Sequence, residues 1–170
     1  MRFEQLIREV KDFPEPGINF RDITPVLQNP SGFKEVIDSF VDRYKSKNIQ
    51  GIAGVESRGF LIAAPLAKEL EVPLLLIRKK GKLPFKTKSV TYDLEYGTDS
   101  LEIHVDSVSK SDKIVLIDDL LATGGTLAAA SKLIEELGGI VVELGVIIEL
   151  VDLNGRVKLK ELPIHSLCKI

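Results

Sequence analysis

Sulfur and large aromatic side chains are scarce in this chain. Its 170 residues include one cysteine, one methionine and no tryptophan. Because the single cysteine, Cys168, cannot form a disulfide within the chain, we expect a protein of a reducing compartment, with a cytoplasmic location. Cys168 also lacks the neighbours of a nucleophile, and His104 and His165 lack the spacing of metal ligands. We therefore expect structural roles for the two histidines and a free, buried or surface thiol at Cys168.

An excess of charge and long hydrophobic runs are also lacking. The formal net charge is −2. This value excludes a general electrostatic attraction to nucleic acid or to a membrane, and we expect neither as a partner. No stretch reaches the length of a transmembrane helix, and residues 1–10, MRFEQLIREV, mix charges into an amphipathic pattern unlike a signal-peptide core. These absences fit an ordinary soluble enzyme.

Apolar patterns alternate along the chain between short β-branched runs and helical stripes. Strands are predicted at 49–55, 74–77, 114–117 and 140–150, and helices at 3–10, 30–44, 60–70 and 127–137. Because 44% of the residues are hydrophobic, the chain can bury one good core, and we expect a single domain over residues 1–170. The alternation predicts the α/β class, with a central, mostly parallel sheet covered by helices on both faces.

Two segments depart from this alternation. Residues 18–27 are predicted to be extended, because the turn sequence DFPEPG ends the first helix before them. Residues 89–105 have the pattern of a β-hairpin or a mobile flap, since Leu101, Ile103 and Val105 alternate with polar residues.

The most informative segment is VLIDDLLATGGT, residues 115–126. An apolar strand leads into Asp118 and Asp119, and a loop of small residues follows before a helix. Open α/β sheets bind ligands at this end of a strand. The N–H groups of the loop and of the helix N-terminus suit one phosphate, and ribose hydroxyls or hydrated Mg²⁺ would hold both carboxylates ionised. We interpret the segment as a site for a phosphorylated sugar; the alternative is an acidic turn with a helix cap.

This segment resembles the 5-phosphoribosyl-1-pyrophosphate (PRPP) signature of type I phosphoribosyltransferases. The resemblance implies the fold of that family, with a small N-terminal hood at about residues 1–28 and a flexible β flap at about 79–106. It also implies that Asp118 and Asp119 contact the ribose hydroxyls. The residues implied to wrap the 5′-phosphate are Ala122, Thr123, Gly124, Gly125 and Thr126. A Walker A loop is excluded because no lysine follows its second glycine.

Two further segments supply candidate contacts for the leaving pyrophosphate. GVESRGF, residues 54–60, follows a predicted strand and opens a helix, so it suits a second anion, and the resemblance identifies it as the pyrophosphate loop. RKKGKLPFKTK, residues 78–88, has six basic residues and no acid. The candidate side chains are Ser57, Arg58, Arg78, Lys79 and Lys82. The alternatives are a surface helix cap and a solvated basic face.

The sequence PEPGINFRDITPVL, residues 14–27, together with RKKGKLP and YDLEYG, resembles adenine phosphoribosyltransferases, and ordered matches run from about residue 10 to about residue 150. The resemblance implies a hood over the purine, in which backbone groups near Asn19 and the side chain of Arg21 contact adenine. Asn19 departs from the more apolar residue of many members, a change that a backbone contact tolerates. The alternative for Arg21 and Asp22 is a local ion pair.

The same resemblance implies a catalytic role for Glu95 of the flap. In the family, the corresponding glutamate closes over the substrates and interacts with the imidazole nitrogens of the purine, and the following tyrosine, here Tyr96, lines the closed site. Because Glu95 stands between Leu94 and Tyr96, closure would remove its water and raise its pKa toward a useful acid/base range. A solvent-facing strand residue is the alternative.

As a whole, the resemblance implies transfer of the phosphoribosyl group of PRPP to N9 of adenine, giving AMP and pyrophosphate in purine salvage. It implies Mg²⁺ bound mainly through PRPP and pyrophosphate, with no direct protein ligand assigned, and a homodimer. A xanthine or hypoxanthine-guanine phosphoribosyltransferase and a non-catalytic PRPP-sensing regulator remain alternatives. We expect no room in 170 residues for the DNA-binding segment that such regulators carry.

Overall fold

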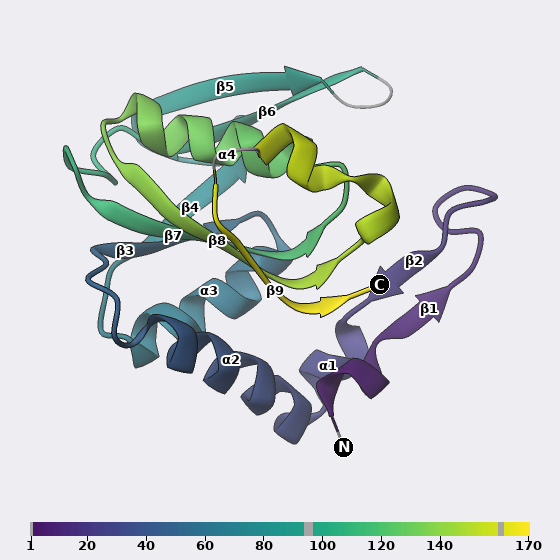
Figure 1. The fold of residues 1–170 in the computed structure, drawn as a ribbon. Coiled ribbons are helices and arrows are strands. Elements are labelled where there is room, and N and C mark those ends of the chain that lie inside the picture. Colours follow the sequence, from purple (N-terminus) through teal and green to yellow (C-terminus); the bar gives the residue numbers. More distant parts are fainter. Residues whose placement is uncertain (1, 94–96, 160–161) are drawn as a thin grey trace.

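The computed structural model describes residues 2–93, 97–159 and 162–170. Within these residues, seven strands form one sheet in the order β5-β6-β4-β3-β7-β8-β9, and β1 and β2 form a separate hairpin (Figure 1). The strands are β1 (Arg8–Val10), β2 (Phe20–Asp22), β3 (Gly51–Val55), β4 (Leu74–Lys79), β5 (Thr87–Asp93), β6 (Thr98–His104), β7 (Lys113–Leu121), β8 (Ile140–Glu149) and β9 (Ile164–Lys169). The α-helices are α1 (Thr24–Gln28), α2 (Pro30–Tyr44), α3 (Arg58–Glu69) and α4 (Gly125–Glu136), and the 3₁₀ helices are η1 (Phe3–Leu6), η2 (Val151–Leu153) and η3 (Gly155–Leu159).

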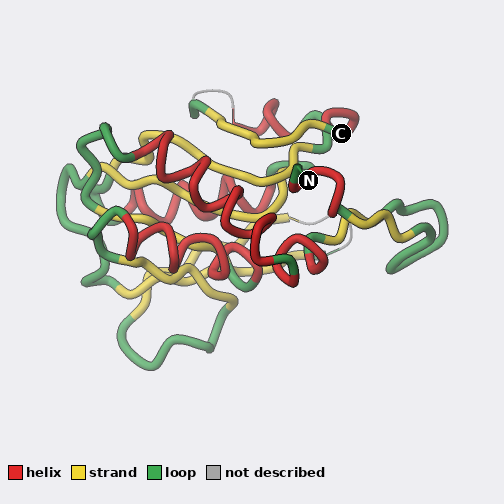
Figure 2. Tube along the Cα trace, turned by 90° about the horizontal axis from the view of Figure 1, so that it is seen from below, coloured by secondary structure: helices red, strands yellow, loops and turns green. Residues whose placement is uncertain are grey.

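The main sheet is mostly parallel and is covered on both faces. Strands β4, β3, β7, β8 and β9 run parallel, whereas β6 and β5 are antiparallel at one edge. Helices α2 and α3 lie on one face of the sheet and α4 on the other (Figure 1). Helices α2 and α3 share one apolar cluster with the sheet, and α4 packs on a second cluster. Figure 2, seen from the side of α2 and α3, shows the β1–β2 hairpin extending beyond the body. The predicted α/β architecture is confirmed.

Helix α2 forms where the sequence predicts it. The side chain of Asn29 accepts a hydrogen bond from the N–H of Gly32 at 2.9 Å, and Pro30 occupies the first helical position. The predicted apolar stripe faces the sheet, where Phe40 and Tyr44 are buried. A local cap and a hydrophobic stripe thus agree, and together they define this helix.

Strand β3 lies in the middle of the sheet, and all five of its residues are buried. Gly54 lets α3 approach β3 closely, because a Cβ at this position would lie 2.8 Å from the Cβ of Ala63. Helix α3 begins at Arg58, two residues before the predicted start. This close packing fixes the first turn of α3 beside the end of β3.

The predictions for the N-terminal segment are partly wrong. The first helix ends at Leu6, and Val10 instead pairs with Phe20 in the β1–β2 hairpin. Residues 24–27, predicted to be extended, belong to α1, which runs to Gln28 and has Pro25 in its first turn. The spacing of apolar residues favours a helix through Val10, but pairing with residues 20–22 makes residues 8–10 a strand. A short window of sequence does not reveal this distant partner.

The strand predicted at 114–117 is longer in the structure. Pairing between β7 and β3 stops at Ile117, but pairing with β8 continues to Leu121, so that Asp118 and Asp119 lie within β7 and not after it. Both carboxylates nevertheless lie beyond the last residue of β7 that pairs with β3. The strand therefore carries them past the end of its neighbour, to the side of the first turn of α3, where Asp119 remains buried.

The described parts of the segment 89–105 belong to β5 and β6, which pair antiparallel at the edge of the main sheet. Strand β6 pairs with β5 on one side and with the end of β4 on the other, and Leu101 and Ile103 are buried in the cluster under α4. That this hairpin moves as a flap stays a prediction. The sequence analysis did not anticipate β9, in which five of the six residues are half-buried, so that it lacks the alternation of a typical edge strand.

Candidate active site

Two cavities lie at the carboxyl ends of the parallel strands. From β3, the chain passes through α3 to β4 on one side of β3, whereas β7 pairs with the other side. The connections therefore change direction at β3, and in α/β sheets such a switch point opens a crevice. The first, which we name the central cavity, has a volume of about 620 Å³. Its lining includes Glu56, Ser57, Arg58, Lys79, Lys82, Asp118, Asp119 and the five residues from Ala122 to Thr126. The structure thus brings together all the predicted PRPP contacts except Arg78.

The predicted 5′-phosphate loop joins β7 to α4. Gly124 has a φ of +81°, a left-handed conformation that glycine adopts without steric cost, and α4 begins at the next residue. The hydroxyl of Thr126 donates a hydrogen bond to the hydroxyl of Tyr92 at 3.4 Å, which ties the first turn of α4 to β5. The free N–H groups of this first turn and the positive end of the helix dipole favour an anion.

The acidic pair is held in a defined geometry. The Oδ1 atom of Asp118 accepts a hydrogen bond from the backbone N–H of Asp119 at 2.9 Å. Burial and the neighbouring charge of Asp119 raise the pKa of the Asp118 carboxyl well above its ordinary value. Arg58 pairs with Asp119 and not with Asp118, so the attraction of its charge does not offset the burial of the Asp118 carboxyl.

Arg58 connects the acidic pair to the hood. Its Nε atom donates to Oδ2 of Asp119 at 2.5 Å, and its guanidinium lies 5.4 Å from the centre of the Phe20 ring in β2. Gly59 allows this approach, since a Cβ there would lie 2.9 Å from the carbonyl oxygen of Ile117 and 3.0 Å from Oδ1 of Asp118. Arg58 is therefore more than a surface cap of α3, because it pairs with the buried Asp119.

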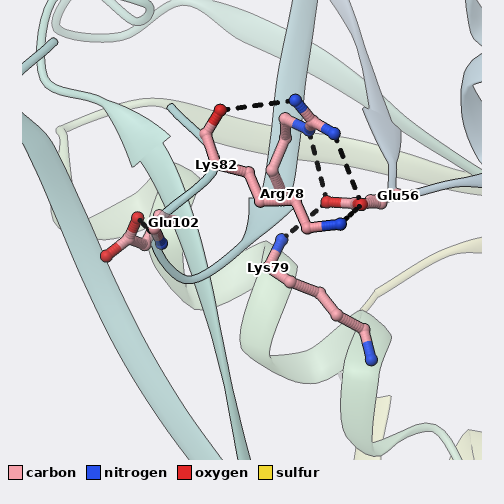
Figure 3. A network of polar contacts seen from close by, with 6 residues as sticks. Glu56, Arg78, Lys79, Lys82 and Glu102 are labelled. Atoms are coloured by element: carbon pink, nitrogen blue, oxygen red, sulfur yellow. Dashed lines mark hydrogen bonds and ion pairs between the residues drawn. The ribbon is translucent and has the colours of Figure 1, made fainter. Parts of the chain in front are cut away.

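Glu56, which the sequence analysis missed, organises the basic loop after β4 (Figure 3). Its side chain, 9% exposed, accepts hydrogen bonds from Arg78 at 3.3 and 3.4 Å, from Lys82 at 3.1 Å and from the backbone N–H of Lys79 at 2.9 Å. Burial raises the pKa of Glu56, but these hydrogen bonds outweigh burial and hold the pKa below its ordinary value. The signal available in the sequence was Glu56 itself, the single acid of the segment GVESRGF, which otherwise supplies candidate anion contacts.

The basic residues of this loop divide into two groups. Lys79 and Lys82 line the central cavity, and Lys79 also pairs with Asp99 at 3.1 Å. Arg78 instead points to Glu56 and donates to the carbonyl oxygen of Lys82 at 3.3 Å (Figure 3). Arg78 is not among the residues that line the cavity, and its guanidinium is paired with the buried carboxylate of Glu56. Its direct contact with pyrophosphate stays a prediction.

A second cavity, of about 760 Å³, lies between the hood and the ends of β7, β8 and β9, and we name it the hood-side cavity. Its lining includes Gly17, Ile18, Asn19, Arg21, Asp93, Thr123, Gly125, Thr126, Leu150, Asp152, Leu153, Lys158 and Ile170. Both residues predicted to contact the base, Asn19 and Arg21, are among them.

Arg21 and Asp22 do not pair with each other, as the alternative for this segment had it. Arg21 pairs with Glu9 at 2.9 Å, whereas Asp22 pairs with Arg8 at 2.6 Å and accepts from the N–H of Thr24. Burial raises the pKa of Asp22, but the hydrogen bonds from Thr24 and Arg8 outweigh burial and lower the pKa to about 2. The hood strands are thus joined across the hairpin, and Arg21 still lines the cavity.

Two predicted site residues, Glu95 and Tyr96, lie outside the described residues. The residues predicted to be structural lie against other elements: His104 contacts the Phe85 ring edge-on, and His165 contacts Phe40 in the same way. Burial raises the pKa of the Cys168 thiol, which makes it a poor nucleophile.

Comparisons with known proteins agree with this site. The family model described as "Phosphoribosyl transferase domain" matches residues 22–164. A protein from Chloroflexus aurantiacus named adenine phosphoribosyltransferase is 54% identical over 162 residues, covering 95% of this chain and 94% of that protein. The chain belongs to the adenine phosphoribosyltransferase family.

Solved structures of the family have the same fold. A crystal structure of adenine phosphoribosyltransferase from Thermoanaerobacter pseudethanolicus matches with a TM-score of 0.96 and 49% identity, over 99% of this chain and 98% of that chain. The enzyme from Trypanosoma brucei, solved in complex with AMP, pyrophosphate and ribose-5-phosphate, matches with a TM-score of 0.91 and 31% identity, over 98% of this chain and 77% of that one. As a family member, the chain is a phosphoribosyltransferase enzyme. No helix in the part described combines the length and hydrophobicity needed to cross a membrane.

Proposed function

We propose that this enzyme transfers the phosphoribosyl group of PRPP to N9 of adenine, forming AMP and pyrophosphate for purine salvage. The observation that carries the proposal is that the two cavities meet, because Thr123, Gly125 and Thr126 line both. A sugar phosphate held at this loop can present its reactive carbon to either side. The relative from Trypanosoma brucei, solved with AMP, pyrophosphate and ribose-5-phosphate, supports this set of ligands.

In the reaction, the bond between C1 of the ribose and the pyrophosphate oxygen breaks, and its electron pair leaves with pyrophosphate. N9 of adenine forms the new bond to C1 and loses its proton. The sugar carbon develops positive charge between these events, so the site must exclude water and stabilise the leaving group.

The central cavity supplies these functions. Asp118 and Asp119 accept hydrogen bonds from the ribose hydroxyls, and the loop from Ala122 to Thr126 binds the 5′-phosphate. Lys79 and Lys82 lie at the pyrophosphate end together with Ser57 and Arg58. Arg78 is the further candidate at this end, and Glu56 binds it and Lys82 together. Charges that are already in position cost no reorganisation when the pyrophosphate leaves.

Mg²⁺ fits this cavity as a companion of PRPP. The carboxylates of Asp118 and Asp119 are hard oxygen donors of the kind that Mg²⁺ prefers. Among the residues described, no cluster of three or more acidic, histidine or cysteine side chains offers a complete protein cage. When bound, Mg²⁺ neutralises charge on the pyrophosphate oxygens, and Asp118 and Asp119 would hold it on the protein side, directly or through water. Omission of the metal should abolish AMP formation, and full activity in a chelator would refute its involvement.

The base occupies the hood-side cavity, where Asn19 contributes backbone contacts and Arg21 its side chain. Glu95 handles the proton of the purine imidazole, and Tyr96 closes the site. If Glu95 acts only in proton transfer, E95Q should lower the single-turnover rate about 10²- to 10⁴-fold and leave PRPP affinity nearly constant. A normal single-turnover rate would refute this role.

The deciding experiment supplies PRPP and Mg²⁺ with adenine, hypoxanthine, guanine, xanthine or uracil in separate reactions and identifies the nucleotide formed. Because hypoxanthine presents an oxo acceptor where adenine presents an amino donor, a dry pocket built for the donor would leave its own groups unpaired. We expect discrimination of order 10⁴ in favour of adenine. Comparable use of hypoxanthine would overturn the adenine assignment, and formation of no nucleotide with any base would favour a PRPP-sensing regulator.

We further propose a homodimer. Leu74 and Leu76 pair with Ile52 and Gly54, so they lie on the sheet face that α3 covers, and both are 39% exposed. Leu61 of α3, the helix on this face, is also exposed. Apolar surface of this kind indicates an interface. Sedimentation should give twice the chain mass, and L76D should reduce it; a wild-type monomer at micromolar concentration would refute the proposal.

The cytoplasm is the location that fits this chain best. Its single cysteine cannot form an internal disulfide, and a reducing compartment keeps such a thiol free. Fractionation of cells with an antibody to the protein would test this location, and recovery in a secreted fraction would refute it.

A further inference from the structure

The 3₁₀ helix η3 packs directly against the 5′-phosphate loop. A Cβ at Gly124 would lie 2.4 Å from the carbonyl oxygen of Gly155, and a Cβ at Gly155 would lie 2.2 Å from the carbonyl oxygen of Ala122. Neither contact tolerates a side chain, so backbone touches backbone. The conformation of the loop therefore depends on a segment about 30 residues further along the chain.

The segment that contains η3 is firmly attached to the sheet. Arg156 donates to both carboxylate oxygens of Glu149 at 2.5 and 2.7 Å, and Ser166 of β9 donates to the same carboxylate at 2.7 Å. These hydrogen bonds, Arg156 first, lower the pKa of Glu149 to about 2. Leu159 is buried in the cluster under α4. The contacts of Arg156 and Leu159 therefore fix the positions of Gly155 and Lys158, which lie next to them in the chain.

That residue, Lys158, reaches the start of α4. Its Nζ atom lies 3.8 Å from the position of a Cβ at Gly125, and the residue lines the hood-side cavity with Thr123 and Thr126. Lys158 forms no ion pair with any acidic side chain of residues 2–93, 97–159 and 162–170. A cation at the positive end of a helix dipole is unfavourable by itself and becomes favourable when an anion lies between them.

We propose that Lys158 is a binding residue for the 5′-phosphate of PRPP and AMP, and that Gly155 positions the loop that holds this phosphate. The inference rests on the proposed function. Lys158 adds a mobile point charge to the fixed N–H groups of the loop and approaches the phosphate from the hood side, opposite the cations of the pyrophosphate end.

The test compares wild type, K158Q and the control K132Q by calorimetric titration with ribose 5-phosphate and, separately, with pyrophosphate. Lys132 suits as a control because it lies on α4, is exposed and pairs with Glu136 away from the loop. We expect K158Q to bind ribose 5-phosphate about five- to tenfold more weakly and pyrophosphate normally, with K132Q unchanged. In kinetics, K158Q should raise KM for PRPP, leave kcat nearly constant, and recover in K158R.

The outcomes separate this inference from the proposed function. Equal affinity of wild type and K158Q for ribose 5-phosphate would overturn the role of Lys158. An equal loss for both ligands would overturn it too, because it would indicate a general electrostatic effect. If the wild-type enzyme makes AMP normally while K158Q is unaffected, only the inference fails. If the wild type binds neither ligand and makes no AMP, the proposed function fails first.

Discussion

The two ends of the central cavity prepare for anions in different ways. At the 5′-phosphate loop, the donors are backbone N–H groups, the side chains are small, and Gly124 lies against Gly155. At the basic loop after β4, the donors are the side chains of Lys79 and Lys82. Glu56 binds the backbone N–H of Lys79 and the side chain of Lys82, which lie 23 and 26 residues further along the chain. One end is specified by backbone shape and the other by paired charges.

This difference teaches where each end is sensitive. Backbone donors cannot change rotamer, so their geometry fails only when the packing behind them fails. Side-chain donors are half-exposed, so salt screens them and neighbouring charges redirect them. We therefore expect packing changes to damage the phosphate loop, and ionic conditions to affect the basic loop.

The largest expected effect comes from Gly124, with Gly81 of the basic loop as its matched control. Both have φ near +80°, so G124A and G81A incur a similar backbone cost of about 1–2 kcal/mol. Only at Gly124 would the new Cβ meet backbone, whereas the space at Gly81 is open. Displacement of the loop should lower kcat/KM for PRPP about 10²-fold in G124A, with a much smaller loss in G81A. Equal losses in steady-state kinetics would contradict this comparison.

Asp118 gives an intermediate effect in which activity and stability change in opposite directions. Since the pKa of Asp118 is raised in the folded protein, ionisation costs folding free energy, and stability falls as the pH rises through that folded pKa. D118N removes this cost but also removes a charged partner of the ribose. We expect kcat/KM for PRPP to fall about tenfold or more, while Tm above that pH rises by about 2–4 °C for each 1 kcal/mol recovered.

Thermal melts of the free enzyme from pH 5 to pH 9 would check this prediction. Asp119 is the control, because it pairs with Arg58 and D119N should therefore lower Tm. If wild type and D118N show the same dependence of Tm on pH, the buried charge of Asp118 carries no stability cost.

The smallest effect is expected at Lys82. K82Q should weaken pyrophosphate binding about fivefold at low salt, and the difference should shrink as ionic strength rises, because Lys82 is half-exposed. Lys80 is the control, since it lies in the same basic run outside the lining of the central cavity. Titrations at two salt concentrations measure both. Equal losses in K80Q and K82Q would indicate that only the net charge of the run matters.

The sequence predicted best those parts in which local signals agree. Helix α2 has its cap at Asn29 and its stripe through Phe40, and the phosphate loop has adjacent acids, small residues and a helix start within twelve residues. The family assignment and the α/β fold, which rest on such signals, are confirmed. The site roles of individual residues, including Glu95, stay predictions.

Prediction failed where a distant partner decides the structure. Val10 has helical spacing but pairs with Phe20 across the hairpin, and β7 extends through Asp118 because β8 continues beside it. The contact of Glu56 with Arg78 was likewise not anticipated, because the two residues lie 22 positions apart in the sequence. None of these partners is visible in a window of ten or twenty residues.

The sequence by itself determined the family, the alternation of strands and helices, and most of the predicted residues that line the central cavity, because each depends on chemistry within a short stretch of chain. Only the tertiary structure decided how the two anion sites are supported. Glu56 reaches the basic loop because β3 and β4 are neighbours in the sheet, and Gly155 reaches the phosphate loop because η3, held by Glu149 at the end of β8, packs against it. Strand order creates both contacts, and it is fixed by burial over the whole sheet.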